Sequence, residues 1–204
     1  MAIVGGNVRD NPSMASVDIH ITGERDADEL LSKNPLALLL GMVLDQQVTM
    51  EWAFRGPLEL SRRMGGKLNA ASIAAMDPDT FVTIFSEKPA LHRYPGSMAK
   101  RTQDVCQLIV DEFDGDASQI WDRASDANDL YKRVKQIPGF GEMKAKIFIA
   151  LLGKQVGLNT ADWQSVCAPY GEAGVFRSVA DVVDLSSLDK VRAAKMAAKK
   201  NATK

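Results

Sequence analysis

The feature that most constrains the fold is the apolar run Leu36–Leu44, which follows Asn34-Pro35. Asparagine can cap a helix and proline fits the first helical turn, so this segment predicts a helix from Leu36 to Gln47. A helix that is apolar on nearly every side has to be buried on nearly every side. The apolar run is also too short for a transmembrane helix, which takes about 20 residues. The sequence therefore predicts a protein built around one central helix.

The remaining elements are short, and nearly all of them have helical periodicity. Apolar and polar residues alternate from Val17 to Ile21, which predicts one short strand that stops at Gly23. From residue 26 onward the pattern is helical, and Ser97 is expected to cap a long amphipathic helix. The predicted helices cover residues 49–63, 79–85, 98–113, 127–136, 142–152, 162–169 and 185–200, and another begins near residue 69. Helices with short connections define an all-α fold class. Residues 1–16, which are small and polar, are expected to be disordered.

The cysteine content excludes several classes of protein. The chain of 204 residues has two cysteines, Cys106 and Cys167, and two histidines. This excludes a disulfide framework, a four-cysteine zinc site and an iron–sulfur cluster held by four cysteines of one chain. The N-terminal residues have no signal-peptide pattern and no apolar run is long enough for a membrane span, so no membrane partner is expected. The expected localisation is cytoplasmic, or nucleoid-associated in a bacterium.

The net charge of −1 hides an asymmetry along the chain. Residues 190–204 contain six lysine and arginine residues and no acid, whereas residues 1–189 carry a net charge of −7. A short basic segment on an acidic body suggests a non-specific contact with a polyanion. The same residues equally suit the solvated end of a helix.

The most informative segment is Ile137-Pro-Gly-Phe-Gly141, which separates two predicted helices. Glycine allows a positive φ and lets another molecule approach the backbone closely. The helix that begins directly after Gly141 adds unpaired N–H groups and the positive end of its dipole. Together these features predict an anion site that suits a DNA phosphate. The alternative is a tight turn in a helical bundle that has no binding role.

Three segments together resemble the helix-hairpin-helix DNA glycosylase superfamily (HhH-GPD, endonuclease III-like). Residues 137–141 are similar to the family hairpin, usually Leu-Pro-Gly-Val-Gly, and residues 34–49 are similar to an early buried helix that ends in Ser-Gln-Gln or Ser-Ala-Gln. Here Asp45 replaces that serine before Gln46 and Gln47. Residues 92–110 are similar to a loop and helix of the family. The resemblance covers residues 28–166.

The resemblance implies a two-lobed helical protein that binds double-stranded DNA across a cleft. One lobe would consist of residues 34–152, with the helix-hairpin-helix at 127–152, and the other of residues 17–33 and 153–189. The basic tail, residues 190–204, would follow the second lobe. Such enzymes act in base excision repair, where they flip a damaged base out of the duplex and cut its N-glycosidic bond. The protein is expected to act as a monomer.

The resemblance also implies which residues contact DNA, with Gln47 entering the gap left by the flipped base. The expected contacts are Gln46, Gln47, His92, Arg93, Ser97, Lys100, Arg101, Gly139, Phe140, Gly141, Lys144 and Lys146. Backbone carbonyls of Lys135, Ile137 and Phe140 would hold a monovalent cation, Na⁺ or K⁺. No other cofactor is expected, and the iron–sulfur cluster of many family members is excluded by the cysteine count. Each contact also has a plainer interpretation, because glutamines can cap a helix, a loop histidine can hold its loop and lysines can be solvated.

The resemblance also implies a catalytic carboxylate about twenty residues after the second hairpin glycine, and Asp162, 21 residues after Gly141, is the candidate. Breaking a glycosidic bond builds positive charge on the sugar, and a nearby carboxylate stabilises that charge or activates water. The surrounding Ala-Asp-Trp-Gln differs from the Val-Asp-Thr-His context that is usual in the family. Asp162 can equally cap the helix predicted after it, and the two roles can coexist.

A second catalytic activity, strand cleavage at abasic sites, is not expected. Family members with this lyase activity carry a nucleophilic lysine two residues after the second hairpin glycine. Met143 occupies that position here, and Lys144 follows it, rotated by about 100° around the helix. The leading hypothesis is therefore a monofunctional DNA glycosylase. The alternatives are a DNA-binding protein that lacks catalysis and a helical protein-interaction domain whose hairpin is fortuitous.

Overall fold

The computed structural model describes residues 17–202 of the chain, and every structural statement below refers to these residues. Its secondary structure is helical throughout, with eleven α-helices and no strand in the described range. The first six are α1 (Arg25–Lys33), α2 (Pro35–Leu44), α3 (Met50–Arg63), α4 (Ala70–Ala74), α5 (Pro78–Ser86) and α6 (Pro95–Glu112). The others are α7 (Gln119–Asp122), α8 (Ala127–Gln136), α9 (Glu142–Leu151), α10 (Trp163–Cys167) and α11 (Leu185–Ala202). The π-helix η2 (Leu152–Val156) continues α9, and the 3₁₀ helix η3 (Val179–Asp181) precedes α11. The all-α prediction is confirmed.

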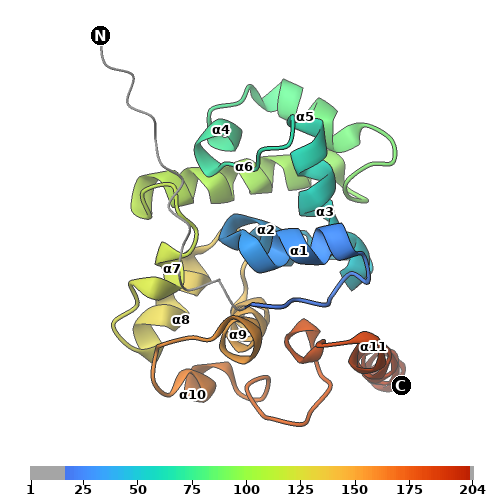
Figure 1. Cartoon of the computed structure of the whole chain (residues 1–204), viewed down its shortest axis with the longest axis vertical. Coiled ribbons are helices and arrows are strands. Elements are labelled where there is room, and N and C mark those ends of the chain that lie inside the picture. The colour runs from blue at the N-terminus through green and yellow to red at the C-terminus, as the bar shows by residue number, and fades with distance from the viewer. Residues whose placement is uncertain (1–16, 203–204) are drawn as a thin grey trace.

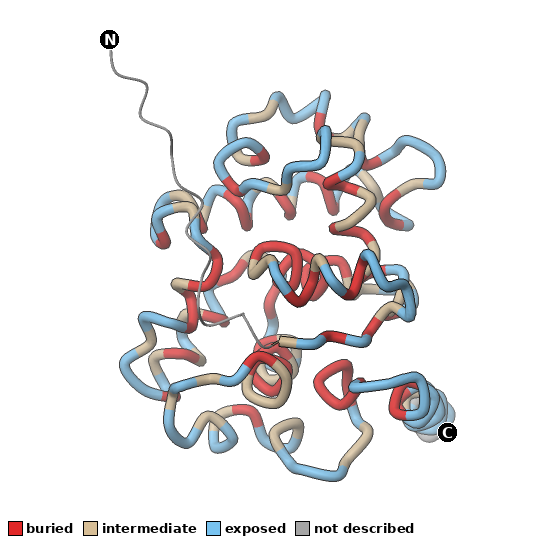
Figure 2. The backbone as a smooth tube through the Cα atoms, viewed as in Figure 1, coloured by how far each residue is buried: buried red, intermediate tan, exposed pale blue. Residues whose placement is uncertain are grey.

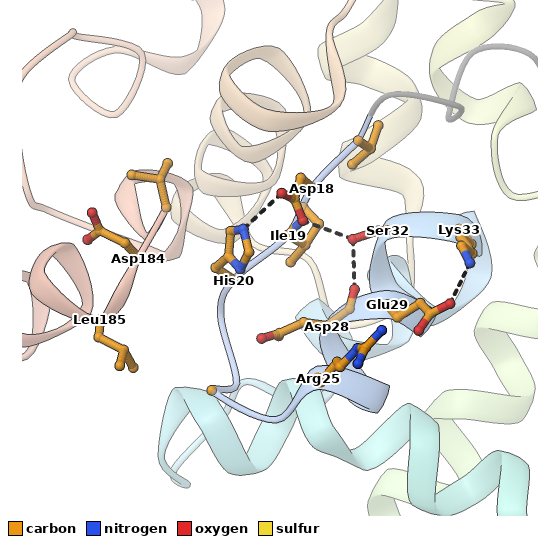
Figure 3. A pocket seen from close by; sticks show the side chains of 13 residues that line it. Asp18, Ile19, His20, Arg25, Asp28, Glu29, Ser32, Lys33, Asp184 and Leu185 are labelled. Atoms are coloured by element: carbon orange, nitrogen blue, oxygen red, sulfur yellow. Dashed lines mark hydrogen bonds and ion pairs between the residues drawn. The ribbon is translucent and has the colours of Figure 1, made fainter.

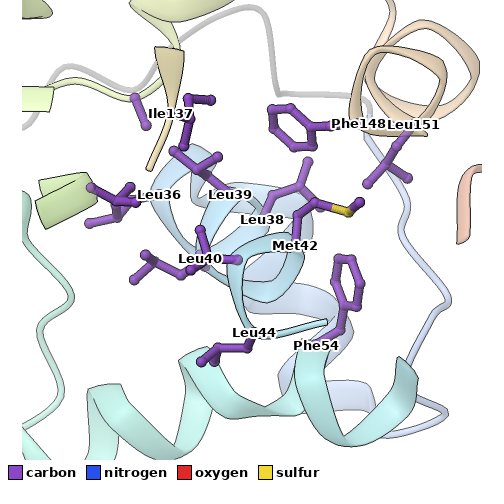
Figure 4. Packing of buried hydrophobic residues seen from close by; sticks show 14 of the residues in the cluster. Leu36, Leu38, Leu39, Leu40, Met42, Leu44, Phe54, Ile137, Phe148 and Leu151 are labelled. Carbon is purple, nitrogen blue, oxygen red and sulfur yellow. The ribbon is translucent and has the colours of Figure 1, made fainter. Parts of the chain in front are cut away.

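Helix α2 lies at the centre of the protein, as its apolar sequence predicts. It contacts α1, α3 and α6, and every residue from Leu36 to Leu44 is buried. In Figure 1, α4, α5 and α6 lie on one side of α1 and α2, and α7 to α11 lie on the other. Side chains from α9, including Phe148 and Leu151, surround α2 together with Phe54 of α3 (Figure 4). The central helix therefore joins the elements on both sides into one core (Figure 2).

The predicted strand at residues 17–21 is wrong, because this segment is extended but pairs with no other described strand. The alternation that predicted it reflects burial, since Ile19 and Ile21 are both inaccessible to solvent. Their backbone N–H groups donate to side chains of α1 instead. Ile19 N donates to Ser32 Oγ at 2.9 Å, and Ile21 N donates to Asp28 Oδ1 at 3.1 Å. A helix thus supplies the hydrogen bonds that a neighbouring strand would supply.

Two helix boundaries differ from the prediction near the residues of functional interest. Helix α2 ends at Leu44, so Gln46 and Gln47 lie in the turn after it. Helix α6 begins at Pro95 because proline fits the first helical position, and Ser97 therefore lies in the first turn. The Ser97 hydroxyl donates to Tyr94 O at 3.3 Å, so it is not the cap of this helix. The expected disorder of residues 1–16 lies outside the described residues.

Among the described residues, none of the helices has the length and hydropathy needed to cross a membrane. Both cysteines are buried and reduced in this structure. Burial raises the pKa of Cys106 to about 12 and that of Cys167 to about 11, so both thiols stay protonated at neutral pH.

Candidate nucleic-acid interface

The connection between α8 and α9 is a tight turn with one buried and one exposed side. Phe140 N donates to Ile137 O at 2.9 Å, and Gly139 has a φ of 87° that favours glycine. The Phe140 ring is buried edge-on against Phe148, with centroids 5.7 Å apart. Gly141 is exposed and precedes the first residue of α9. The turn therefore fixes its apolar side in the core and presents its glycine backbone at the surface.

Arg101 of α6 lies against this turn. A Cβ atom added at Gly139 would come within 2.6 Å of Arg101 Cδ, so the arginine side chain lies against the first glycine. The Arg101 guanidinium also donates to Gln46 Oε1 at 2.8 Å, across 55 residues of sequence. One side chain thus joins α6, the α8–α9 turn and the residues after α2.

The end of α2 and the residues after it receive three further hydrogen bonds from distant elements. Lys144 Nζ of α9 donates to Met42 O at 2.9 Å and to Val43 O at 3.2 Å. His92, in the loop before α6, bonds Gln46 O through Nε2 at 2.8 Å, and its Nδ1 accepts from Tyr94 N at 3.0 Å. Because Nδ1 is an acceptor, the histidine is the neutral tautomer with its proton on Nε2. We call the place where residues 42–47, 92–101 and 139–144 meet the junction.

Gln47 has an unusual backbone conformation in the junction. It is exposed and has a φ of 54°, in the left-handed region that non-glycine residues rarely adopt. Its side-chain oxygen accepts a hydrogen bond from Tyr94 Oη at 3.3 Å. Within residues 17–202, the other non-glycine residues with a positive φ are Asp114 and Asp162. Such conformations need support from their surroundings, and they cluster at functional sites.

The two titratable donors of the junction have lowered pKa values. Burial lowers the pKa of Lys144 to about 8, although the Asp45 carboxylate acts in the opposite direction and Arg101 adds to the decrease. Burial also lowers the pKa of His92, against the hydrogen bonds to the carbonyls of Gln46 and Leu44. At pH 7 the junction therefore contains a neutral histidine and a protonated lysine that titrates unusually early.

The junction contains most of the residues predicted to contact DNA, but several of them make contacts within the protein. Lys144 turns inward to α2, in contrast to the expectation that it reaches phosphates or solvent. His92 is buried and holds its loop against Gln46. Lys100 pairs with Asp104 at 2.8 Å, Lys146 pairs with Glu142 at 2.7 Å, and the Arg93 guanidinium lies 5.4 Å from the Tyr94 ring centroid. The charges of Lys100 and Lys146 are therefore partly offset by carboxylates, and Arg93 lies against an aromatic ring.

Sequence reasoning gave Glu142 no role on this surface, and it did not foresee the contacts of Tyr94. Glu142 places a carboxylate in the first turn of α9, directly beside the proposed anion site. The sequence places Glu142 directly after the hairpin glycine, where an acid would repel a phosphate, so this residue could have been found. Tyr94 contacts both Gln47 and His92, and only the fold brings these residues together.

Asp162 lies outside the three segments of the junction, at the start of α10, which packs against α8 and α9. It is exposed, its φ is 54°, and in this structure its side chain makes no capping hydrogen bond. The predicted capping role is therefore wrong, because the residue adopts a left-handed conformation in place of the extended one of a typical cap. Its backbone carbonyl accepts from Ser165 N at 2.9 Å.

A hollow of about 370 Å³ is lined by Trp163 and Gln164, the two residues that follow Asp162 in the chain. Phe176 contributes a second aromatic wall. Lys154 and Asp181, paired at 2.5 Å, lie in the same lining, and both side chains are largely buried. A hollow with two aromatic walls and a buried ion pair suits a flat polar ligand in size and chemistry.

A larger hollow, of about 730 Å³, lies between residues 17–33 and residues 183–185 (Figure 3). Two pairs of its lining side chains contact each other, His20 with Asp18 at 3.1 Å and Lys33 with Glu29 at 2.5 Å. None of its lining residues belongs to the junction. In the described part of the chain, no group of three or more His, Cys, Asp and Glu side chains could hold a metal ion.

The carbonyls predicted to hold a monovalent cation are of a suitable kind. Ile137 O accepts the N–H of Phe140 and keeps a second lone pair. Lys135 and Ile137 lie at the end of α8, where the helix dipole is negative. Neutral carbonyl oxygens replace the hydration shell of K⁺ in other proteins. Neutral carbonyl oxygens are thus the kind of ligand that a monovalent cation takes.

No family model matches the chain, and no curated protein or solved structure matches it either. The function has therefore to be inferred from the chemistry of the junction and of the residues around Asp162.

Proposed function

We propose that this protein binds double-stranded DNA through the junction and hydrolyses the N-glycosidic bond of a flipped, damaged base. One observation carries the proposal. Three segments that the family resemblance assigns to DNA, each distant in sequence, are joined by direct hydrogen bonds at the junction. A structural bundle needs no such convergence of an exposed glycine turn, a strained glutamine and an arginine.

Gly141 is the proposed contact for the DNA backbone. Its φ of −78° is available to any residue, and a Cβ atom there would meet no described atom within 4 Å. Neither conformation nor internal packing therefore requires glycine at this position. An external requirement accounts for it, because a phosphate approaching the N–H groups at the start of α9 needs an unobstructed backbone. A cation on the carbonyls of Lys135, Ile137 and Phe140 would add positive charge to this contact.

Gln47 is the proposed residue that enters the gap in the base stack. Its side chain is exposed at the tip of a turn, and its backbone conformation is held by the junction. Flipping a base breaks its stacking and pairing, and an inserted side chain compensates for part of that loss. Arg101, which contacts the glycine turn and Gln46, would join the two DNA contacts.

Asp162 is the proposed catalytic carboxylate. As the bond between base and sugar lengthens, positive charge develops on the sugar, and a carboxylate stabilises it. The base leaves with the bonding electron pair and takes a proton from solvent. Water adds its oxygen to the sugar carbon, and the carboxylate accepts the proton lost by that water and returns it to solvent, so that one water is consumed in all. The hollow beside Trp163 and Phe176 is the proposed space for the flipped base. In this arrangement residues 34–152 form one lobe, and residues 17–33 and 153–189 form the other.

Strand cleavage at abasic sites is not part of the proposal. Met143, at the position of the lyase lysine, is 65% exposed and has no amine, and the amine of Lys144 is bonded to α2. The basic end of α11 contributes a further, non-specific contact. Arg192 bonds Glu51 of α3, which ties the start of this basic helix to a residue that shortly follows Gln47 in the chain.

A base-release assay tests the proposal. Duplexes that contain uracil, oxidised bases or alkylated bases are incubated with the wild-type protein and with Asp162→Asn. Asparagine tolerates the left-handed conformation as aspartate does, so the fold should be kept. We expect release from at least one lesion, abolished in Asp162→Asn while DNA binding remains.

The alternatives give different results in the same assay. Binding without release from any lesion favours the non-catalytic DNA-binding protein. Duplex binding that is undetectable even at low salt would leave a protein-interaction domain, because phosphate contacts strengthen as salt falls.

A further inference from the structure

The end of helix α2 is unusually well supplied with hydrogen-bond donors. The last carbonyls of a helix have no partners within the helix, and they form the negative end of its dipole. Here Gly41 O accepts from Asp45 N, and Leu44 O accepts from Gln46 N at 2.7 Å. Met42 O and Val43 O accept from Lys144, which lies on another helix. All four carbonyls are therefore occupied, two of them by a side chain from α9.

Lys144 occupies this position at an energetic cost. An ammonium group that leaves water loses hydration, which is the largest cause of its lowered pKa. The groups that face it from the other elements do not cancel that cost: Asp45 attracts it, whereas Arg101 repels it. The ammonium group gains charge-assisted hydrogen bonds and the favourable end of the α2 dipole in return. A side chain held in this way constrains the two elements that it joins.

The segment constrained by Lys144 leads directly to Gln47. From the other side, His92 bonds Gln46 O, and Tyr94 bonds the Gln47 side chain. The left-handed conformation of a non-glycine residue costs roughly 1–2 kcal/mol, so it persists only where its surroundings impose it. The turn between α2 and α3 is therefore held from α9 and from the loop before α6 at once.

We propose that Lys144, together with His92, holds Gln47 in its strained conformation and so acts as a positioning residue for the insertion of Gln47 into the duplex. This inference rests on the proposed function for its DNA step. We call the hydrogen bonds from Lys144 to Met42 O and Val43 O the clamp. The clamp joins α9 to the end of α2 and does not depend on DNA.

The clamp is tested first without DNA, by amide hydrogen exchange in wild type, Lys144→Met and Lys144→Arg. We expect exchange of the Asp45 and Gln46 amides to quicken about tenfold or more in Lys144→Met, because local opening no longer breaks the two hydrogen bonds. Lys144→Arg, which keeps a charged donor, should restore most of the protection. Lys132→Met removes a lysine that is exposed on α8 and serves as the control. Unchanged exchange at Asp45 and Gln46 in Lys144→Met would overturn the inference.

The positioning role is tested with a fluorescent adenine analogue placed opposite or beside a lesion in a duplex. Unstacking of the analogue raises its fluorescence, and the increase should fall in both Gln47→Ala and Lys144→Met, by a larger factor than duplex affinity falls. Residues that act through one another are not additive, so the double variant should be no worse than Gln47→Ala. Additive losses would contradict the role of Lys144 in positioning Gln47.

The two experiments separate the inference from the proposed function. If the wild-type protein neither binds nor unstacks any duplex, the proposed function fails and the positioning role fails with it. The exchange experiment then still decides whether Lys144 holds the end of α2. If DNA is unstacked normally by Lys144→Met, the proposed function stands and this inference fails.

Discussion

At the scale of single residues, the junction depends on groups whose charge state is set by burial. His92 is 2% exposed, and both of its ring nitrogens have partners in the neutral state. A second proton would have to sit on Nδ1, which already faces the Tyr94 N–H donor. Lys144 and Arg101 add positive charge to the same surroundings. Protonation of His92 at low pH should therefore weaken the hold on the loop before α6.

We predict that His92 lowers the free energy of unfolding as the pH falls. Its pKa in the folded protein is lowered from the ordinary 6.5, so the unfolded chain binds this proton more tightly. The contribution of His92 is therefore complete above about pH 6.5 and is lost as pH falls through the folded pKa. The free energy of unfolding, measured with urea at pH 7.5 and 5.5, should decrease less in His92→Gln than in wild type.

The control for this experiment is His20→Gln, which removes the other histidine of the chain. Carboxylates also titrate toward pH 5, and their contribution is common to all three proteins. An identical pH dependence in wild type and His92→Gln would show that the buried imidazole has no part in it.

At the scale of elements, the sequence predicted the helices well where caps and periodicity were local. Helix α8 has the predicted bounds, Asn34 caps α2 as predicted, and α4 begins at Ala70, near the predicted residue 69. The failures have a tertiary cause. Ile19 and Ile21 alternate like a strand because they are buried, and α1 supplies their backbone partners.

The part of the candidate site that depends on local sequence was predictable, and the part that depends on tertiary contacts was not. The glycine turn is a local motif and could be found in the sequence. The inward direction of Lys144 depends on the position of α2, 101 residues earlier in the chain, and no sequence pattern specifies it. The side-chain freedom of Asp162 was missed because capping was judged from residue type, without the backbone conformation.

Helix α9 contains a feature that opposes the proposed phosphate contact. Glu142, in its first turn, is held ionised because the hydrogen bond and the charge of Lys146 lower its pKa. This carboxylate favours the helix through the dipole but repels a phosphate that approaches Gly141. We predict that Glu142→Gln binds duplex DNA several-fold more tightly at low salt, with the difference shrinking as salt rises.

Glu112→Gln is the matched control for this prediction, since it removes one exposed acid at the far end of α6. It lies 11 residues beyond Arg101, which corresponds to about 16 Å along a helix. Equal gains in Glu142→Gln and Glu112→Gln would mean that only net charge matters and that α9 does not face the phosphate.

At the scale of the whole molecule, charge is separated between an acidic body and the basic helix α11. The start of this helix is part of the fold, because Val191 is buried and Arg192 bonds Glu51 and Asp189. Most of the helix beyond residue 191 is exposed (Figure 2). The basic tail predicted at 190–204 therefore begins with an anchored part, and the helix that follows it faces mostly solvent.

We predict that the part of the basic tail after Arg192 adds non-specific affinity for DNA. Replacing Lys195, Lys199, Lys200 and Lys204 by glutamine removes four charges and keeps the anchored residues. Affinity for every duplex sequence should fall at low salt. The slope of log affinity against log salt should also become shallower, by about 0.9 for each phosphate that the protein no longer neutralises. Identical slopes in wild type and the variant would remove the tail from the binding surface.

Binding of the DNA backbone by the α8–α9 turn is tested by Gly141→Ala. Alanine fits the φ of −78° and meets no described atom within 4 Å, so the melting temperature should not fall. Gly139→Ala is the contrast, because a φ of 87° and the nearby Arg101 make it destabilising. We predict that Gly141→Ala binds a labelled duplex more weakly than wild type, in titrations across a range of salt, at unchanged stability. Equal affinity of the two proteins at every salt concentration would contradict it.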